Sequence, residues 1–330
     1  GCGWIGYGGE AVRPCVDDSP GSTHDALTRA CAAHRIAGIF SRHGGITLGQ
    51  NLRILSVNAH PHDFTHYAGT LGIHAASGDE VTVVSVTTGE ATHNEALHDE
   101  LMKPEVERDP AIINQRAGDY SAVKAKELEE ACAIFGITDV RILGFSQPYR
   151  VSLFPESIDA LRDVIMETRP HVMITQSPHT ATRNGMAARM PDDHEETAFM
   201  SLEARSRAAT ATPGDTVAPH TIAAIYYPGV YYQNDELDFV VDISDWFEKR
   251  VAAEDKYISQ GHYPAWSRRR MEVSLGNVGW FAGTMYGEAF VREKPELVSR
   301  MTVAESDLRR ASEPIGDYYG RIVGERPPAH

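Results

Sequence analysis

The chain has 330 residues, of which 42% are hydrophobic and 23% charged, a composition typical of a soluble globular protein with one large domain or a domain with an appendage. Its formal net charge of −15 disfavours a nucleic-acid backbone or an anionic membrane as a partner. No run is long enough for a transmembrane helix and no signal-peptide pattern opens the sequence, so we expect a cytoplasmic protein; a homo-oligomer is left open.

Residues 1–50 are glycine-rich and weakly patterned, which predicts an N-terminal extension with a short helix around residues 24–40. The stretch GCGWIG has the glycine spacing of a dinucleotide-binding loop, but such a loop follows a strand, so the nucleotide interpretation is disfavoured. The cysteines contain no CxxC pair, which favours free thiols and leaves a Cys2–Cys15 disulfide open. They are Cys2, Cys15, Cys31 and Cys132.

From residue 52 onward, short apolar runs alternate with amphipathic segments. The apolar runs predict strands over residues 52–59, 80–88, 139–145 and 171–177. The amphipathic segments predict helices over residues 64–78, 121–136, 155–170 and 194–209. Near-continuous apolar strands that alternate with helices predict an α/β fold, Rossmann-like, with three αβα layers and a mostly parallel sheet.

The second half of the chain is less regular. We expect a long polar loop over residues 179–193, a linker over 210–219, and late strands over 221–227 and 237–243. The predicted organisation is an N-terminal extension (1–50), a core (51–245) and a mostly helical C-terminal extension (246–330) that completes the domain.

Two clusters of histidine and carboxylate follow the first and fourth predicted strands. His60 and Asp63 directly follow the first, and His194 comes after the fourth, beyond the loop over residues 179–193. Because a parallel sheet brings the carboxyl ends of its strands to one edge, we expect these side chains to meet there. Two imidazoles and one carboxylate, with a position left for water, are the ligands of a catalytic zinc, although another divalent ion is left open. The competing interpretation is that these are surface histidines and that Asp63 is a helix N-cap.

At this point the sequence resembles the LmbE-like (PIG-L) family of zinc-dependent N-acetylglucosaminyl deacetylases, over roughly residues 52–292. The resemblance rests on five segments in the family's order. They are AHPHD (59–63), GDEVTVVSVTTGEAT (78–92), KAKELEEACAIFGITDVRILGF (124–145), PDDHEETA (191–198) and GTMYGEAFV (283–291).

The resemblance implies that His60, Asp63 and His194 are the metal ligands and that Asp193 steadies a neighbouring side chain. It also gives Glu90 a structural role. The first departure from the family is His62, which stands where relatives keep an aspartate base. An imidazole can take a proton from water held by zinc, so we predict His62 as the general base, with loss of base function or metal binding as alternatives.

The second departure is Pro191, which stands where the family keeps a histidine that stabilises the oxyanion. We predict that His179 folds back to replace it. His66 lies three residues after Asp63 on the same helix face and is expected to point towards the site. Further candidates for substrate contact, with solvated surface positions as the competing interpretation, are His93, Arg183 and Arg189.

The leading functional prediction is a zinc-dependent amidohydrolase that removes an acyl group, with acetyl expected, from an amino sugar or a related conjugate. Its partner would be a small-molecule N-acylated substrate. One alternative keeps the metal site and changes the substrate to a non-sugar amide or a thiol conjugate. Another is a non-catalytic descendant that binds metal or sugar.

Overall fold

The structure is a computed structural model that describes residues 51–90, 94–145, 150–179 and 193–325. The features predicted within residues 1–50, including GCGWIG, the short helix and three of the cysteines, lie outside the described residues. Residues Asn51–His330 form one compact unit. Within it Cys132 is a buried free thiol.

A seven-stranded sheet organises this unit, in the order β3-β2-β1-β4-β5-β7-β6. The pairs β3–β2, β2–β1, β1–β4 and β4–β5 are parallel, whereas β7 pairs antiparallel with both β5 and β6. The predicted mostly parallel sheet is therefore confirmed. The strands are β1 (Arg53–Asn58), β2 (Glu80–Thr87), β3 (Asp139–Phe145), β4 (Val172–Ile174), β5 (Ala224–Pro228), β6 (Phe239–Asp242) and β7 (Gly287–Arg292).

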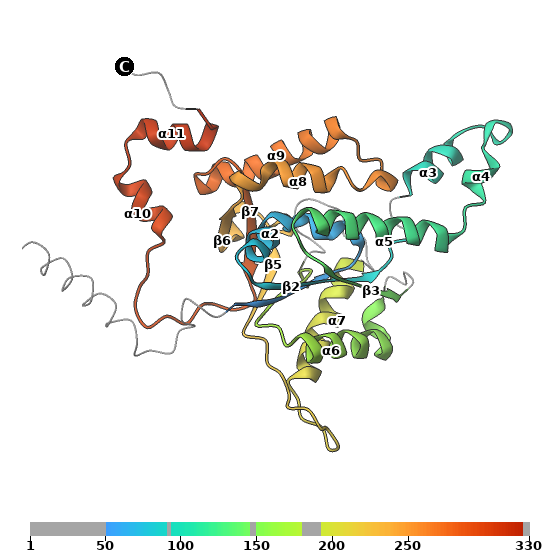
Figure 1. Cartoon of the computed structure of the whole chain (residues 1–330), viewed down its shortest axis with the longest axis horizontal. Helices are drawn as coiled ribbons and strands as arrows, with labels where there is room; N and C mark the ends of the chain where they lie inside the picture. The colour runs from blue at the N-terminus through green and yellow to red at the C-terminus, as the bar shows by residue number, and fades with distance from the viewer. Residues whose placement is uncertain (1–50, 91–93, 146–149, 180–192, 326–330) are drawn as a thin grey trace, which may run out of the picture. The chain divides into compact units, whose positions relative to one another are not determined.

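Helices cover both faces of the sheet, which completes the predicted three-layer arrangement (Figure 1). The α-helices are α2 (Ala68–Ala76), α3 (Glu95–Met102), α4 (Pro110–Ile113), α5 (Ala117–Ile134), α6 (Pro155–Thr168), α7 (Asp193–Ala208), α8 (Phe247–Glu254), α9 (Pro264–Ala282), α10 (Glu305–Ser312) and α11 (Ile315–Val323). Short 3₁₀ helices are η1 (Pro61–His66), η2 (Glu105–Glu107), η3 (Val151–Leu153), η5 (Gly229–Tyr231), η6 (Asn234–Glu236), η7 (Ser244–Trp246) and η8 (Ile258–Gln260).

Alternate residues of the central strand β1 supply the two cores. Leu55 and Val57 pack with α6 and α7 on one face of the sheet. Ile54 packs on the other face with residues of α2, α5 and α8. All three side chains are almost fully buried, as expected for a strand with helices on both faces.

Three predicted elements differ from the structure. The helix expected over residues 64–78 is divided at Tyr67 into η1 and α2, because the buried Tyr67 hydroxyl bonds to Asn58 Oδ1 at 2.8 Å and Ser56 Oγ at 2.9 Å, which holds this residue against β1. The expected fourth strand is shortened to the three residues of β4. The third difference is the segment between β2 and α5, in which no element was expected and which contains α3 and α4.

The C-terminal tail contributes a strand that its sequence did not predict. β7 lies between β5 and β6, so residues after 246 complete the sheet as well as adding helices. Among the described residues, none of the helices combines the length and apolar character needed to cross a membrane.

A substitution at Gly72 tests how closely α2 packs against its neighbours. A Cβ added at Gly72 would overlap the ring of Phe135 and lie 2.9 Å from the ring of Trp246. We expect Gly72→Ala to lower the free energy of unfolding by about 1–3 kcal/mol, because overpacking displaces both rings. The control is Gly118→Ala in α5, where an added Cβ meets nothing within 4 Å and the effect should be neutral or favourable. Urea unfolding of both variants measures the difference, and equal stabilities would contradict it.

Candidate functional site

The loop after β1 places two predicted ligands on one short turn. η1 begins at Pro61, directly after His60, and the His60 backbone N–H donates to Asp63 Oδ2 at 2.9 Å. This bond closes the turn, and the three-residue spacing puts both side chains on the same side of a 3₁₀ helix. His60 and Asp63 are 6% and 4% exposed, so the loop presents them from within the protein.

The third predicted ligand comes from the start of α7. β1 and β4 are neighbouring parallel strands, so their carboxyl ends share one edge of the sheet at the point where the strand order reverses. His194 Nε2 lies 3.3 Å from Asp63 Oδ1 there. One ligand atom from each of His60, Asp63 and His194 lies within 4.8 Å of the others. The structure therefore brings the predicted triad together.

The histidines around Asp63 keep its carboxylate charged. Burial alone would raise the pKa of Asp63, but His194, His60 and His66 hold it well below its usual range. Gln176 Nε2 also donates to Asp63 Oδ2, at 3.3 Å. The carboxylate is consequently ionised at neutral pH, which is the form that binds a metal.

Asp193 lies behind His60. Its Oδ2 is 2.9 Å from His60 Nε2, and both side chains are buried. His60 Nδ1 is then the nitrogen that faces Asp63, at 3.7 Å from Oδ2. A carboxylate that holds the far nitrogen of a histidine ligand is the usual outer layer of a zinc site. Two imidazoles and one carboxylate arranged this way fit a zinc ion with one open position.

The loop after β2 forms a wall beside His60. Gly89 has a positive φ of 65°, and a Cβ added there would lie 3.5 Å from His60 Cβ. Lys124 Nζ donates to the Gly89 carbonyl at 2.7 Å, and burial lowers the pKa of Lys124 to about 8. Glu90 Oε2 accepts from the Thr88 hydroxyl at 2.6 Å. These contacts support a structural role for the TTGE segment.

His66 lies next to the triad, as the sequence predicted. Its ring centroid is 5.7 Å from that of Tyr231, which is in turn 6.0 Å from that of His194. Burial lowers the pKa of His66 to about 3, so this imidazole is neutral at pH 7. Within the described residues, its buried Nδ1 has no hydrogen-bond partner. Tyr231, on η5, is a neighbour that the sequence did not predict.

His62 contacts a second group of polar side chains. Its Nε2 lies 3.0 Å from Glu254 Oε1, 3.1 Å from Arg270 Nη1 and 3.3 Å from Thr65 Oγ1. In the part of the chain that the structure describes, none of its hydrogen bonds uses Nδ1. The base role of His62 stays a prediction, and Nδ1 is the nitrogen left for it.

Of the four remaining predicted residues, the structure describes His179 alone. His179 is exposed on the turn after β4, where its backbone N–H donates to Ser177 Oγ at 3.1 Å, and its oxyanion role stays a prediction. His93, Arg183 and Arg189 lie outside the described residues.

Glu288 in the segment GTMYGEAFV supports the site from β7. Its two carboxylate oxygens accept from the backbone N–H groups of Gly69 and Thr70 at 3.0 and 2.7 Å, at the start of α2. Thr70 Oγ1 donates to it at 2.7 Å and Arg250 Nε at 2.8 Å. The helix that follows the His60–His66 turn is therefore tied to the C-terminal strand.

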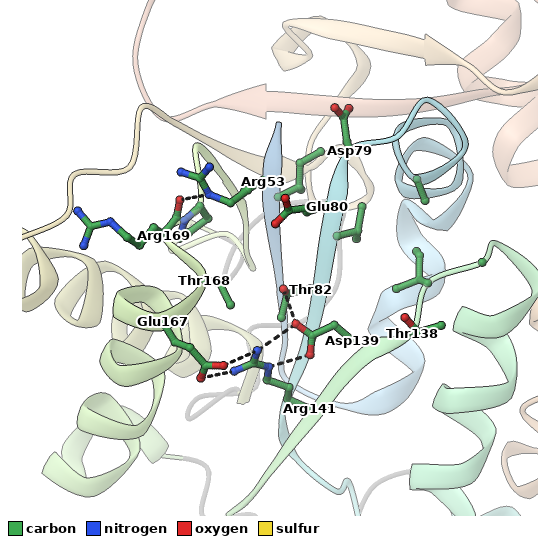
Figure 2. A pocket seen from close by; sticks show the side chains of 16 residues that line it. Arg53, Asp79, Glu80, Thr82, Thr138, Asp139, Arg141, Glu167, Thr168 and Arg169 are labelled. Atoms are coloured by element: carbon green, nitrogen blue, oxygen red, sulfur yellow. Dashed lines mark hydrogen bonds and ion pairs between the residues drawn. The ribbon is translucent and has the colours of Figure 1, made fainter. Parts of the chain in front are cut away.

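A cavity of about 700 Å³ lies at the opposite edge of the sheet, against the amino ends of β1, β2 and β3 (Figure 2). Its charges are used within the protein: Arg141 bonds to Asp139 and Glu167, and Arg53 Nε donates to the Arg169 carbonyl (Figure 2). Because ligands of such sheets bind at the carboxyl edge, we place the functional site at the triad.

Comparison with known proteins finds a family model and curated relatives that resemble this chain. The family model described as PIG-L, GlcNAc-PI de-N-acetylase, matches residues 55–205. The 1D-myo-inositol 2-acetamido-2-deoxy-alpha-D-glucopyranoside deacetylase of Streptomyces griseus is 31% identical over 193 residues, which are 53% of this chain and 54% of that protein. Its counterpart in Thermobispora bispora is 33% identical over 194 residues, 53% of this chain and 58% of that protein. The chain thus spans about half the length of the curated relatives it matches.

Solved structures share the fold. The N,N'-diacetylchitobiose deacetylase of Pyrococcus horikoshii has a TM-score of 0.57 at 18% identity, covering 82% of this chain and 94% of that one. The 4-carboxy-2-hydroxymuconate hydratase GalB of Pseudomonas putida has a TM-score of 0.55 at 19% identity, covering 76% of this chain and all of that one. At these identities the likeness shows the fold alone.

Proposed function

We propose that this chain is a zinc-dependent hydrolase. It belongs through residues 55–205 to the PIG-L (GlcNAc-PI de-N-acetylase) family. The proposed reaction removes an acyl group, with acetyl expected, from the amide nitrogen of an amino sugar or a related conjugate. The observation that carries the proposal is the convergence of His60, Asp63 and His194 at the carboxyl edge of the sheet, inside the matched segment. The curated relatives are named as deacetylases of an acetylated amino sugar joined to inositol, which supports the substrate class.

Each residue of the triad, together with Asp193, has its own part in binding the metal. Asp63 supplies the negative charge, His60 and His194 supply neutral nitrogen ligands, and Asp193 fixes the orientation of His60. A zinc ion held there would lower the pKa of a ligated water towards roughly 7 and polarise the amide carbonyl. This is the chemistry that hydrolysis of an unactivated amide requires.

Two imidazoles close to the triad are candidates for accepting the proton of the attacking water. His62 is the base that the sequence predicts, and it would have to use Nδ1 because Nε2 faces Glu254 and Arg270. His66 is neutral at pH 7, and its Nδ1 has no hydrogen-bond partner among the residues described. Either side chain could then return the proton to the leaving amine.

The test is hydrolysis by the purified, zinc-loaded full chain. We expect release of acetate from at least one member of a panel of N-acetylated amino sugars that includes a glucosaminyl-inositol and N,N'-diacetylchitobiose. A chelator should stop the reaction and added zinc should restore it. Sugar binding without turnover at high enzyme concentration would favour the non-catalytic alternative. Turnover of only non-sugar amides would keep the metal chemistry and reject the substrate class.

Substitution of Asp193 tests the metal site by a partial loss of zinc affinity. We expect Asp193→Asn to weaken zinc affinity by about 10–100-fold, because the amide no longer holds the far nitrogen of His60 with a negative charge. Competition with a chromogenic chelator measures the affinity. Asp79→Asn is the matched control, since Asp79 Oδ2 also contacts a histidine nitrogen, His74 Nδ1 at 2.7 Å. Equal affinities in the two variants would contradict the role of Asp193.

A further inference from the structure

A second group of two histidines and one carboxylate lies beside the triad and shares no residue with it. His62 is on η1, Glu254 is the last residue of α8, and His262 lies between η8 and α9. Glu254 Oε1 is 3.0 Å from His62 Nε2 and 3.3 Å from His262 Nδ1. One ligand atom from each of the three residues lies within 4.8 Å of the others. Three separate elements therefore bring a zinc-type ligand set to one point.

The two histidine pairs have nearly the same arrangement. In the triad, the ring centroids of His60 and His194 are 5.0 Å apart, with an interplanar angle of 82°. In the second group, those of His62 and His262 are 4.8 Å apart at 79°. Each pair has one buried carboxylate between its nitrogens. The second group thus repeats the geometry that the first offers to a metal.

Glu254 is a fully buried carboxylate that lies beside cationic groups. It is 0% exposed, and its Oε2 has no hydrogen-bond partner in the described part of the chain. Burial alone would raise the pKa of Glu254, yet His62, Arg270 and Arg250 hold it well below its usual range. A buried carboxylate that stays ionised requires positive charge beside it.

Arg270 supplies a cation at this point. Its Nη1 bonds to Glu254 Oε1 and lies 3.1 Å from His62 Nε2. A guanidinium can only donate and a carboxylate can only accept, so His62 Nε2 presents a lone pair, which is also what a metal requires, in the tautomer that pairs with Arg270 rather than with Glu254. The Arg270 side chain is 32% exposed and lies over Trp266 at 5.2 Å, so it has solvent and an aromatic face to move towards. Its position marks where a metal ion would sit.

We propose that His62, Glu254 and His262 form a second binding site for a divalent metal ion of the zinc class, and that Arg270 fills this site when the metal is absent. Two neutral imidazoles and one carboxylate favour zinc over magnesium or calcium, which prefer oxygen ligands. The proposal does not depend on the proposed hydrolysis, because it concerns binding alone.

The site would also explain why a histidine replaces the family's aspartate at position 62. With a metal on Nε2, the neutral ring carries its proton on Nδ1 and has no lone pair left to accept another. His62 would then be a ligand, and His66 would be the imidazole left to accept the proton of the attacking water. The metal-ligand and base roles of His62 exclude each other.

Metal counting tests the proposal on the full chain of 330 residues. Metal is removed with a chelator, excess Zn²⁺ is added and then removed by gel filtration, and bound zinc is measured by mass spectrometry. We expect two equivalents in the wild-type protein and one in His262→Ala, which leaves residues 60–66 unchanged. Arg270→Ala should keep both equivalents, because arginine is not a ligand. His98→Ala, at an exposed position, is the histidine control and should also keep two.

The outcomes separate the two sites. A single equivalent in the wild-type protein that His262→Ala retains, or two equivalents in His262→Ala, overturns the second site. If His194→Ala loses one equivalent of zinc, that equivalent was bound by the triad. If His194→Ala keeps two equivalents while His262→Ala keeps one, the second site is supported and the triad is rejected as the metal centre of the proposed hydrolase. Circular dichroism identifies a misfolded variant. His262→Gln then replaces His262→Ala, and two equivalents in it equally overturn the proposal.

Discussion

Replacing His60 by alanine is expected to remove the metal of the triad and to lower kcat/KM by at least about a thousandfold. Two ligands would remain, and Asp193 would lose the nitrogen that it holds at 2.9 Å. Metal ions contribute several kcal/mol to the transition states of such reactions, and each 1.36 kcal/mol is worth a factor of about ten in rate. Steady-state kinetics and the metal content of the purified variant give the result.

The control for His60→Ala is His98→Ala, because the His98 side chain is 73% exposed on α3 and should leave both quantities unchanged. Full activity of His60→Ala with an unchanged metal content would reject the triad as the catalytic centre. If activity is lost while the metal remains, His60 acts in another way than as a ligand. Circular dichroism of each variant shows whether the fold has survived.

Replacing Glu288 by alanine is expected to lower the free energy of unfolding by about 3–5 kcal/mol, the usual cost of removing one member of a buried ion pair. Glu288 is 2% exposed and accepts from the start of α2 as well as from Arg250. Without the carboxylate, the buried Arg250 charge would lose its near partner and keep only Glu254, whose Oε2 is 4.0 Å from Arg250 Nη1, and two backbone N–H groups would lose their acceptors. Urea unfolding followed by tryptophan fluorescence measures the change.

Glu248→Ala is the matched control for Glu288→Ala. Glu248 pairs with Arg268 from the neighbouring helices, but both side chains are largely exposed, so no measurable loss of stability is expected. Glu288→Gln should fall between the two, because the amide oxygen can still accept one bond but carries no charge. A stability of Glu288→Ala close to that of Glu248→Ala would show that the buried ion pair is not needed.

The parallel half of the sheet and the triad follow from local sequence rules. Apolar runs such as the one around Leu55 mark strands that are covered on both faces, and polar residues directly after them must lie at the carboxyl edge. His60, Asp63 and His194 could therefore be brought together although 131 residues separate Asp63 from His194. The inference needed only the order of the elements.

The rest of the site could not be predicted because its residues share no local pattern. His62 and Glu254 are 192 residues apart, and no local pattern in the helical tail indicates that Glu254 contacts His62. Strand β7 was not predicted for a related reason. Glu288 is buried inside that strand because it accepts hydrogen bonds from another element, so its charge disguises the apolar alternation that identifies a strand.

The position of Glu288 has a consequence for how the protein is made. This carboxylate lies 219 residues after Gly69, whose N–H it accepts, and β7 enters the sheet between two strands that are synthesised earlier. At roughly 5–20 residues per second, the helix next to the triad waits on the order of ten to forty seconds for its partner to leave the ribosome. Until then β5 and β6 have no strand between them, so the nascent chain holds an unfinished sheet that a chaperone could recognise.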